Sequence, residues 1–501
     1  DVSTLKEYLQ QRLPGYMIPA YFVSLPEIPL TAAGKIDRRA LPQPVIDSTA
    51  SYTAPRNELE EKLAAIWAGI LGIEKEQIGI DSNFFEIGGH SLKATQLTAK
   101  IYKTFDIKIP LSEIFRLSSI RTQAHFMAGP GKIKKDDDHG QISIQPASVQ
   151  EYYDLSYAQR RLWIICQFEE DSIAYNEVGG LAIKGKFNPT AFEKAIRTIA
   201  QRHEILRTIF VTIAGEPKQK ILPEVELKLE QADLRHLKEK GDRQEIEAAL
   251  IIKNTANKAF DLEKGPLAVF KLLRLEDERY FLLVNIHHII NDGWSVGVIK
   301  KELNTLYNYF NKNLSGEFPL APVSFQYKDY SLWHNRLIAG GYFDKYKDYW
   351  LEKFKDKPTG IELPLDHPRG AVQTFNGGRV YYTIAEAETT KLQTRCGGEN
   401  ATLFMKLMTL LGILLHKYSG ERDIIMGSPI AGRKQPELHN MIGFLVNTLV
   451  YRLKVEPGES FGQLLARVKA ETLACYENQD YPFDILVENL GLARDMSRSP
   501  L

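Results

Sequence analysis

The chain has 501 residues, and its 63 Lys and Arg balance 63 Asp and Glu, so the formal net charge is zero. At about 150 residues per domain, this length predicts about three domains. Without excess positive charge, the chain lacks a bulk electrostatic attraction to nucleic acid or to an anionic membrane. Its three cysteines are far apart, which argues against a disulfide framework and a cysteine metal site. The sequence contains no signal-peptide pattern and no apolar stretch of membrane-spanning length. We therefore expect a monomeric cytoplasmic protein that binds no nucleic acid, membrane or metal.

Two segments have the composition of linkers. Residues 42–55 are rich in Pro, Ser and Thr, and residues 129–150 combine glycines with a basic cluster and an acidic run. Such segments cannot bury enough apolar surface to offset the entropy lost on folding. They predict an N-terminal fragment at residues 1–45, a small domain at 54–128 and a large domain at 151–501.

The small domain has a helical pattern throughout. A capping-box-like sequence begins at Asn57, and apolar side chains then recur at helical spacing up to Gly72, where a helix end is expected. Further helices are expected to begin at Ser91, Pro110 and Ser119. These signals predict a compact four-helix bundle.

The large domain alternates helical and strand patterns. Residues 191–204 and 295–310 have the apolar stripes of helices, whereas residues 280–287 read as a buried strand. This alternation predicts an α/β architecture.

One motif in the small domain points to a covalent attachment site. In DSNFFEIGGHSL, residues 81–92, two glycines precede Ser91 at the expected start of a helix. A helix N-terminus has free N–H groups and a partial positive charge, so a phosphate ester on Ser91 would be stabilised there. The alternative is that Ser91 only caps the helix. The stretch resembles the core D-x-F-F-x-x-G-G-H-S-L of the peptidyl-carrier (thiolation) domains of nonribosomal peptide synthetases. That resemblance implies a 4'-phosphopantetheine arm on Ser91, added by a phosphopantetheinyl transferase.

A histidine motif follows the predicted buried strand, in NIHHIINDGWS at residues 285–295. Neighbouring side chains of a strand point to opposite faces, so His287 and His288 cannot both bind one metal ion if the strand continues through them. One histidine should face a cleft while the other packs inward; a pair of structural histidines is the alternative. The segment resembles the H-H-x-x-x-D-G motif of nonribosomal peptide condensation domains. The resemblance implies a catalytic site that contains His287, His288, Asp292 and Gly293.

Other condensation-domain motifs follow in the order of that family. They lie at residues 155–163, 202–210, 327–333, 442–448 and 494–501. The resemblance implies four supporting residues, Arg202, Arg207, Trp333 and Asn447. It also implies two chloramphenicol-acetyltransferase-like lobes, at about residues 151–325 and 326–501, and we expect the second lobe to be truncated.

The carboxylate of Asp292 is expected to act through a partner, not by touching substrate. A carboxylate near the junction of two lobes needs a counter-ion, and a bidentate guanidinium suits it best. Arg202 and Arg207 are the candidates, and Arg202 is slightly favoured.

The N-terminal fragment resembles the end of an adenylation domain, at residues 16–21 and 30–42. In that family, the lysine that matches Lys35 contacts the acyl-adenylate. The phosphate-binding and amino-acid-binding parts of such a domain are absent from this sequence. We therefore expect Lys35 to be an ordinary surface lysine.

The reaction implied by the resemblance is amide formation between carrier-bound groups. The α-amine on a downstream carrier would attack an aminoacyl or peptidyl thioester, and His288 would act as general base or position the amine. Adjacent synthetase domains would be the partners. One alternative is a non-catalytic carrier or scaffold fragment. Another is an epimerising relative, which tends to have Trp after the Ser that follows D-G-x, where this chain has Val296. Cyclising relatives replace the first histidine, here His287, with Asp. The Gly-Gly-His-Ser sequence favours an L-configured donor.

Overall fold

The structure is a computed structural model, and its described residues are 52–129 without 86 and 108, 143–168, 173–238, 242–312, 316–356, 358, 360–370, 377–395, 401–492 and 498. The predicted fragment with Lys35, most of the 129–150 segment and most of the motif at 494–501 lie outside them. The chain divides into two compact units. The first contains residues 1–136, 378–424 and 453–477, and the second contains residues 137–377, 425–452 and 478–501. The predicted domain and lobe boundaries stay predictions.

The small domain is helical, as predicted. Its helices are α2 (Glu58–Leu71), α3 (Ser91–Phe105), α4 (Leu111–Arg116) and α5 (Ile120–Ala128), with a 3-10 turn at Lys75–Gln77. Asn57 caps α2 by accepting a hydrogen bond from the Glu60 N–H, and the helix ends at Gly72 with φ 75°. Ser119 caps α5 in a capping box. The four predicted helix starts are confirmed, because each was encoded by local capping or turn residues.

Buried aromatic side chains hold this domain together. The ring of Trp67, on α2, meets that of Phe84 edge-to-face at 4.9 Å between centroids. The Trp67 Nε1–H donates to Gln123 Oε1, on α5, at 3.1 Å. All three side chains are fully buried. The indole therefore contributes apolar burial while its one polar atom keeps a partner.

The remaining helices of the first unit are α12 (Glu386–Arg395), α13 (Leu403–Ser419) and α14 (Phe461–Glu477). Helices α13 and α14 pack against each other. Thr402 caps α13 through its side chain, and Gly420 ends the helix with φ 75°.

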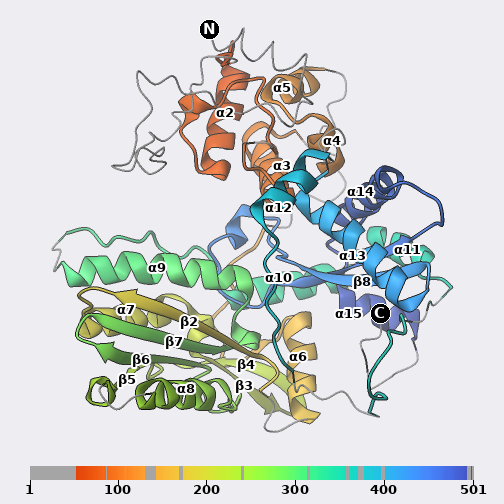
Figure 1. Cartoon of the computed structure of the whole chain (residues 1–501). Coiled ribbons are helices and arrows are strands. Elements are labelled where there is room, and N and C mark those ends of the chain that lie inside the picture. The colour runs from red at the N-terminus through yellow and green to blue at the C-terminus, as the bar shows by residue number, and fades with distance from the viewer. Residues whose placement is uncertain are drawn as a thin grey trace, which may run out of the picture. The chain divides into compact units, whose positions relative to one another are not determined.

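The second unit contains a four-stranded sheet in the order β2–β7–β6–β5 (Figure 1). Its strands are β2 (Asn176–Lys184), β5 (Leu229–Asp233), β6 (Ala268–Glu276) and β7 (Arg279–His287). A smaller antiparallel sheet has the order β1–β4–β3, formed by β1 (Tyr153–Asp154), β3 (Thr208–Ile213) and β4 (Glu216–Ile221). Helices α6 (Tyr157–Phe168), α7 (Pro189–Arg202), α8 (Arg243–Ala256) and α9 (Gly293–Asn311) complete this part. Its 3-10 turns are Glu204–Arg207, Arg235–Leu237 and His288–Ile290.

Strand β7 lies in the interior of the larger sheet. It pairs antiparallel with β2 on one side and with β6 on the other. Most of its side chains are buried, which agrees with the continuous apolar run in the sequence. The helix that follows, α9, packs against α7. The predicted strand 280–287 and helices 191–204 and 295–310 are confirmed within two residues at each end.

The C-terminal half of the second unit includes α10 (Tyr327–Ala339), α11 (Asp344–Lys353) and α15 (Phe483–Leu490), with a 3-10 turn at Pro436–Leu438. Strands β8 (Asp423–Ile430) and β9 (Asn447–Lys454) form a two-stranded sheet. The helices and strands together confirm the predicted α/β architecture. Within the described residues, no helix combines the length and the apolar character that crossing a membrane would need.

Candidate active site

The end of β7 separates the two neighbouring histidines. His287 is the last residue of the strand, and His288 begins a 3-10 turn that leads to α9. The His287 side chain is buried, with 2% exposure, whereas that of His288 is 28% exposed. This confirms the expectation that one histidine packs inward while the other is accessible.

His287 is held as a neutral imidazole. Its Nδ1 accepts a hydrogen bond from the Ile289 N–H at 3.1 Å, so the ring proton lies on Nε2. That nitrogen is 3.8 Å from Cys166 Sγ, on α6. Burial, and to a smaller extent the neighbouring His288, lower the pKa of His287 to about 4. His287 therefore supports the turn as a buried, neutral side chain.

The two ring nitrogens of His288 have different surroundings. Its Nδ1 lies 2.7 Å from the Asn291 carbonyl oxygen, and because a carbonyl oxygen only accepts, Nδ1 must be the donor. The ring of Phe444 meets the imidazole edge-on at 4.9 Å between centroids. In the neutral imidazole, Nε2 therefore carries the lone pair. Nε2 lies 3.6 Å from Oε1 of Glu177, on β2.

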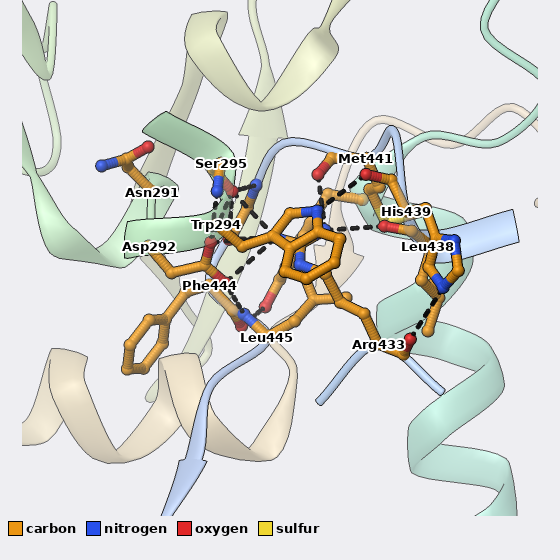
Figure 2. Close-up of polar contacts among 12 residues, drawn as sticks. Asn291, Asp292, Trp294, Ser295, Arg433, Leu438, His439, Met441, Phe444 and Leu445 are labelled. Carbon is orange, nitrogen blue, oxygen red and sulfur yellow. Dashed lines mark hydrogen bonds and ion pairs between the residues drawn. The ribbon is translucent and has the colours of Figure 1, made fainter. Parts of the chain in front are cut away.

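Asp292 is fully buried and anchors the turn (Figure 2). Its Oδ1 accepts from the Ser295 N–H and Oγ–H, each at 2.7 Å, and it caps α9. Arg433 Nη2 donates to both carboxylate oxygens, at 2.9 and 3.0 Å. The Leu445 N–H donates to Oδ2 at 3.0 Å. These donors hold the carboxylate against the start of α9 and the segment 433–445.

Arg433 extends this anchor into the segment 433–445. Its Nη1 donates to the carbonyl oxygens of Leu438 and Met441, at 2.7 and 2.6 Å. Burial lowers the pKa of Arg433, and Asp292 opposes that shift by stabilising the charged form. Figure 2 also shows the indole of Trp294 donating to the carbonyl of His439, at 2.8 Å. The segment 433–445 is therefore fastened to the start of α9 at several points.

The predicted partner of Asp292 was wrong. Arg202 instead contacts Glu302, at 3.2 Å, and the Ala321 carbonyl, at 2.8 Å. Glu302 lies ten residues after Asp292, which is about 15 Å along the axis of α9 at 1.5 Å per residue. Arg207 bonds to the Leu222 carbonyl and lies 3.7 Å from Glu204. Both predicted arginines are therefore engaged elsewhere, and Arg433 was missed because no local pattern distinguishes it.

Residues of separate motifs meet at the histidine turn. The Tyr327 hydroxyl donates to the Phe444 carbonyl at 2.6 Å and lies 2.8 Å from Ser156 Oγ. Gln159 Nε2 donates to the Ile289 carbonyl at 3.0 Å. A Cβ on Gly443 would lie 1.9 Å from a carbon of the Tyr327 ring, so this close approach requires glycine. The motifs at residues 155–163, 327–333 and 442–448 therefore support the same turn.

The other predicted site residues have structural surroundings. Trp333 is buried on α10 and its ring lies 6.0 Å from that of Tyr330. Asn447 Nδ2 donates to the carbonyl oxygens of Gln479 and Tyr481, at 3.0 and 2.9 Å. Neither contact involves the histidine turn. Gly293 begins α9, and a Cβ there would meet no atom within 4 Å, so packing does not require glycine at this position.

The predicted attachment site lies at the start of α3. Ser91 is the first helical residue, and the preceding His90 makes no side-chain cap. No acidic residue occupies the first turn of the helix. Gly88 has φ 104°, and a Cβ on Gly89 would lie 2.3 Å from the ring of Phe84. A helix start without a cap from His90 and without an acidic first turn is compatible with a phosphate ester on Ser91. No cluster of three or more metal-ligating side chains occurs in the described part of the chain.

Comparisons of the sequence with protein families give two matches. Residues 149–501 match the family described as "Condensation domain", and residues 61–127 match "Phosphopantetheine attachment site". All of the chain aligns with bacitracin synthase 3 of Bacillus licheniformis, at 42% identity over 8% of that protein. Gramicidin S synthase 2 of Brevibacillus brevis is 40% identical over 11% of its length. The chain therefore spans about a tenth or less of these relatives.

Solved structures with similar folds include the X-domain from teicoplanin biosynthesis. That similarity has a TM-score of 0.63 at 24% identity and covers 72% of this chain and 78% of the other. The first condensation domain of the calcium-dependent antibiotic synthetase, in complex with a substrate analogue, gives a TM-score of 0.58 at 21% identity. The latter match covers 69% of this chain and 78% of the other. At these identities the likeness concerns the fold, and it confirms the predicted fold class.

Proposed function

Since the chain belongs to the condensation-domain family and carries a phosphopantetheine-attachment domain, we propose that it forms amide bonds in nonribosomal peptide synthesis. The attachment domain would present an aminoacyl or peptidyl thioester on Ser91, and the amine would come from a downstream carrier. The observation that carries this proposal is the geometry of His288, whose Nδ1 is held by the Asn291 carbonyl while Nε2 is left for the reacting amine.

The proposed reaction joins the amine nitrogen to the thioester carbonyl carbon and breaks the carbon–sulfur bond. An α-ammonium must lose two protons in all, one to the leaving thiolate and one to solvent. With a reference pKa of about 7.7–8.0, an α-amine is already partly neutral at pH 7. His288 Nε2 would accept a proton or hold the amine against the carbonyl. Asp292 and His287 would act only by fixing the turn that carries His288.

The attached arm supplies a thioester that stays tethered to the chain. Tethering makes the encounter nearly intramolecular, which raises the effective concentration of the donor. We propose that Ser91 serves as donor site, that the donor is L-configured, and that a phosphopantetheinyl transferase adds the arm. Neighbouring synthetase domains would be the partners, and the cytoplasm the location.

The test loads Ser91 with a labelled aminoacyl group and offers a soluble aminoacyl thioester as acceptor. We expect label on the acceptor nitrogen, at a rate that depends on His288. Label that stays on Ser91 and gains an acyl cap would reverse the direction of transfer. Exchange of the α-proton with deuterated solvent, without amide formation, would identify an epimerising protein. A loaded chain that does neither would be a carrier without catalysis.

A further inference from the structure

A carboxylate that belongs to none of the sequence motifs lies beside the accessible histidine. Glu177 is the second residue of β2, where it pairs with Ile286 of β7. Its Oε1 lies 3.6 Å from His288 Nε2, and its side chain is 28% exposed, the same as that of His288. Nδ1 of His288 is bonded to the Asn291 carbonyl, and Nε2 is the nitrogen that would contact the amine in the proposed reaction. Glu177 therefore lies on the side of the imidazole where the amine would bind.

Asn291 positions Glu177 and His288 together. Its side-chain Nδ2 donates to Glu177 Oε2, and its carbonyl oxygen accepts from His288 Nδ1. Asn291 itself is fully buried. Among the described residues, His288 is the one basic side chain within ion-pair distance of Glu177. The carboxylate is therefore held in place without a permanent cation beside it.

When His288 is neutral, neither His288 Nε2 nor Glu177 Oε1 carries a proton to donate to the other. With the ring proton on Nδ1, neutral His288 presents Nε2 as an acceptor, and Glu177 Oε1 is also an acceptor. Two acceptors 3.6 Å apart are satisfied together by a group with at least two N–H donors and positive charge. A primary ammonium has three such donors, and at a reference pKa of about 7.7–8.0 an α-amine is mostly charged at pH 7.

We infer that Glu177 binds the α-ammonium of the acceptor amino acid. One N–H donates to Glu177 Oε1 and a second donates to His288 Nε2, which can then take that proton and free the nitrogen lone pair. Glu177 forms and breaks no covalent bond in this role. The inference rests on the proposed amide-forming function, because it assigns the acceptor to the space beside His288.

A pair of non-reactive ligands tests this contact directly. The first is an aminoacyl-pantetheine analogue with an amide in place of the thioester. The second is its α-hydroxy counterpart, which lacks the ammonium. We expect the native chain to bind the ammonium ligand about 10-fold to 100-fold more tightly, as for a hydrogen bond to a charged group. Calorimetry measures both dissociation constants.

The preference for the ammonium ligand over its α-hydroxy counterpart is then measured in three variants. Glu177→Gln should abolish the preference for the ammonium ligand, and Glu177→Asp should restore part of it. Glu230→Gln is the matched control, since Glu230 lies on β5 of the same sheet and pairs with Lys271 at 2.9 Å. In turnover, Glu177→Gln should raise the KM for the acceptor more than it lowers kcat.

The outcomes separate the two proposals. A Glu177→Gln protein that keeps the preference overturns the inference. A lower kcat with an unchanged preference also overturns it, because Glu177 would then act only through His288. If the native chain discriminates between the ligands but forms no amide, the proposed reaction fails while the contact stands. Native melting temperatures of the variants establish that they are folded.

Discussion

Asp292 and Arg433 form an ion pair in which both side chains are 0% exposed, with Arg433 Nη2 2.9 Å from Asp292 Oδ1. The two residues are 141 positions apart in the sequence. Removing two charges from water is costly, so such a pair is stable only when further hydrogen bonds satisfy both groups. Ser295 and Leu445 supply those bonds on the carboxylate side. The pair thus joins the histidine turn to the segment 433–445.

Removing one member of this pair should destabilise the protein. Arg433→Met leaves a buried carboxylate without its counter-ion, and we expect a loss of about 3–5 kcal/mol in the free energy of unfolding. Arg235→Met is the control, because Arg235 forms an exposed ion pair with Asp233, and such pairs contribute about 0–1 kcal/mol. The measurement is denaturant unfolding. The double variant Asp292→Asn/Arg433→Met should lose less than the sum of the single losses, and strict additivity would contradict the pairing.

The two histidines should respond oppositely to replacement. His288→Ala is expected to slow amide formation by about 10²–10⁴, as for loss of a general acid–base group. Its melting temperature should change little, because the side chain is partly exposed. His287→Ala should lower the melting temperature, since it removes a buried ring that caps the turn. Loss of activity in a stable His287→Ala protein, with His288→Ala active, would show that the roles are reversed.

Burial of His287 predicts a pH-dependent stability. Its pKa is about 4 in the folded protein, against 6.5 as the reference value. Between these values the unfolded chain binds the proton and the folded chain does not, so stability falls as the pH decreases from 6.5 towards 4. At pH 5, the neutral state of buried His287 lowers the free energy of unfolding by an amount on the order of 2 kcal/mol, relative to its value above pH 7. His287→Gln should therefore flatten the fall in melting temperature between pH 7.5 and pH 5.

His236→Gln is the control for this experiment, because His236 is exposed. His334 also is buried, with a pKa lowered to about 4, so a residual slope should persist in His287→Gln. A slope as steep in His287→Gln as in the native protein would contradict the assignment of a neutral His287.

The attachment site can be tested against a matched serine. Ser91 and Ser119 both lie at helix starts of the small domain, but Ser119 is an N-cap engaged with Thr122. After incubation with a phosphopantetheinyl transferase and coenzyme A, Ser119→Ala should gain the mass of one arm, and Ser91→Ala should gain none. Intact-mass spectrometry with peptide mapping makes the measurement. Modification of Ser91→Ala would place the arm on another residue.

The glycine beside Tyr327 should not tolerate a methyl group. In Gly443→Ala the new Cβ would lie 1.9 Å from the tyrosine ring, so the segment or the ring must move. Overpacking of this kind costs about 1–3 kcal/mol, and the melting temperature should fall accordingly. Gly179→Ala, where a Cβ meets no atom within 4 Å, should be close to native. Equal melting temperatures for the two variants would contradict the close approach.

The sequence by itself determined the features that depend on neighbouring residues. The cap at Asn57 and the helix starts at Ser91 and Ser119 were predicted, because the signals that begin a helix involve residues only a few positions apart. The strand that ends at His287 followed from the apolar run in the sequence. The different exposure of His287 and His288 was also expected, although His288 lies in the 3-10 turn after the strand. The motif resemblance also pointed to the turn that carries His287 and His288, and the catalytic role of that turn stays a prediction.

Only the tertiary structure decided which distant groups meet that turn. Arg433, not Arg202, reaches Asp292, because the packing of α7 against α9 brings Arg202 to Glu302 instead. Glu177 reaches His288 because β2 and β7 pair in a register that sets it opposite Ile286. Hydrogen bonds and ion pairs act over a few ångströms in space, whereas sequence patterns report neighbours along the chain. A partner more than a hundred residues away leaves no local pattern, so the fold alone selects it.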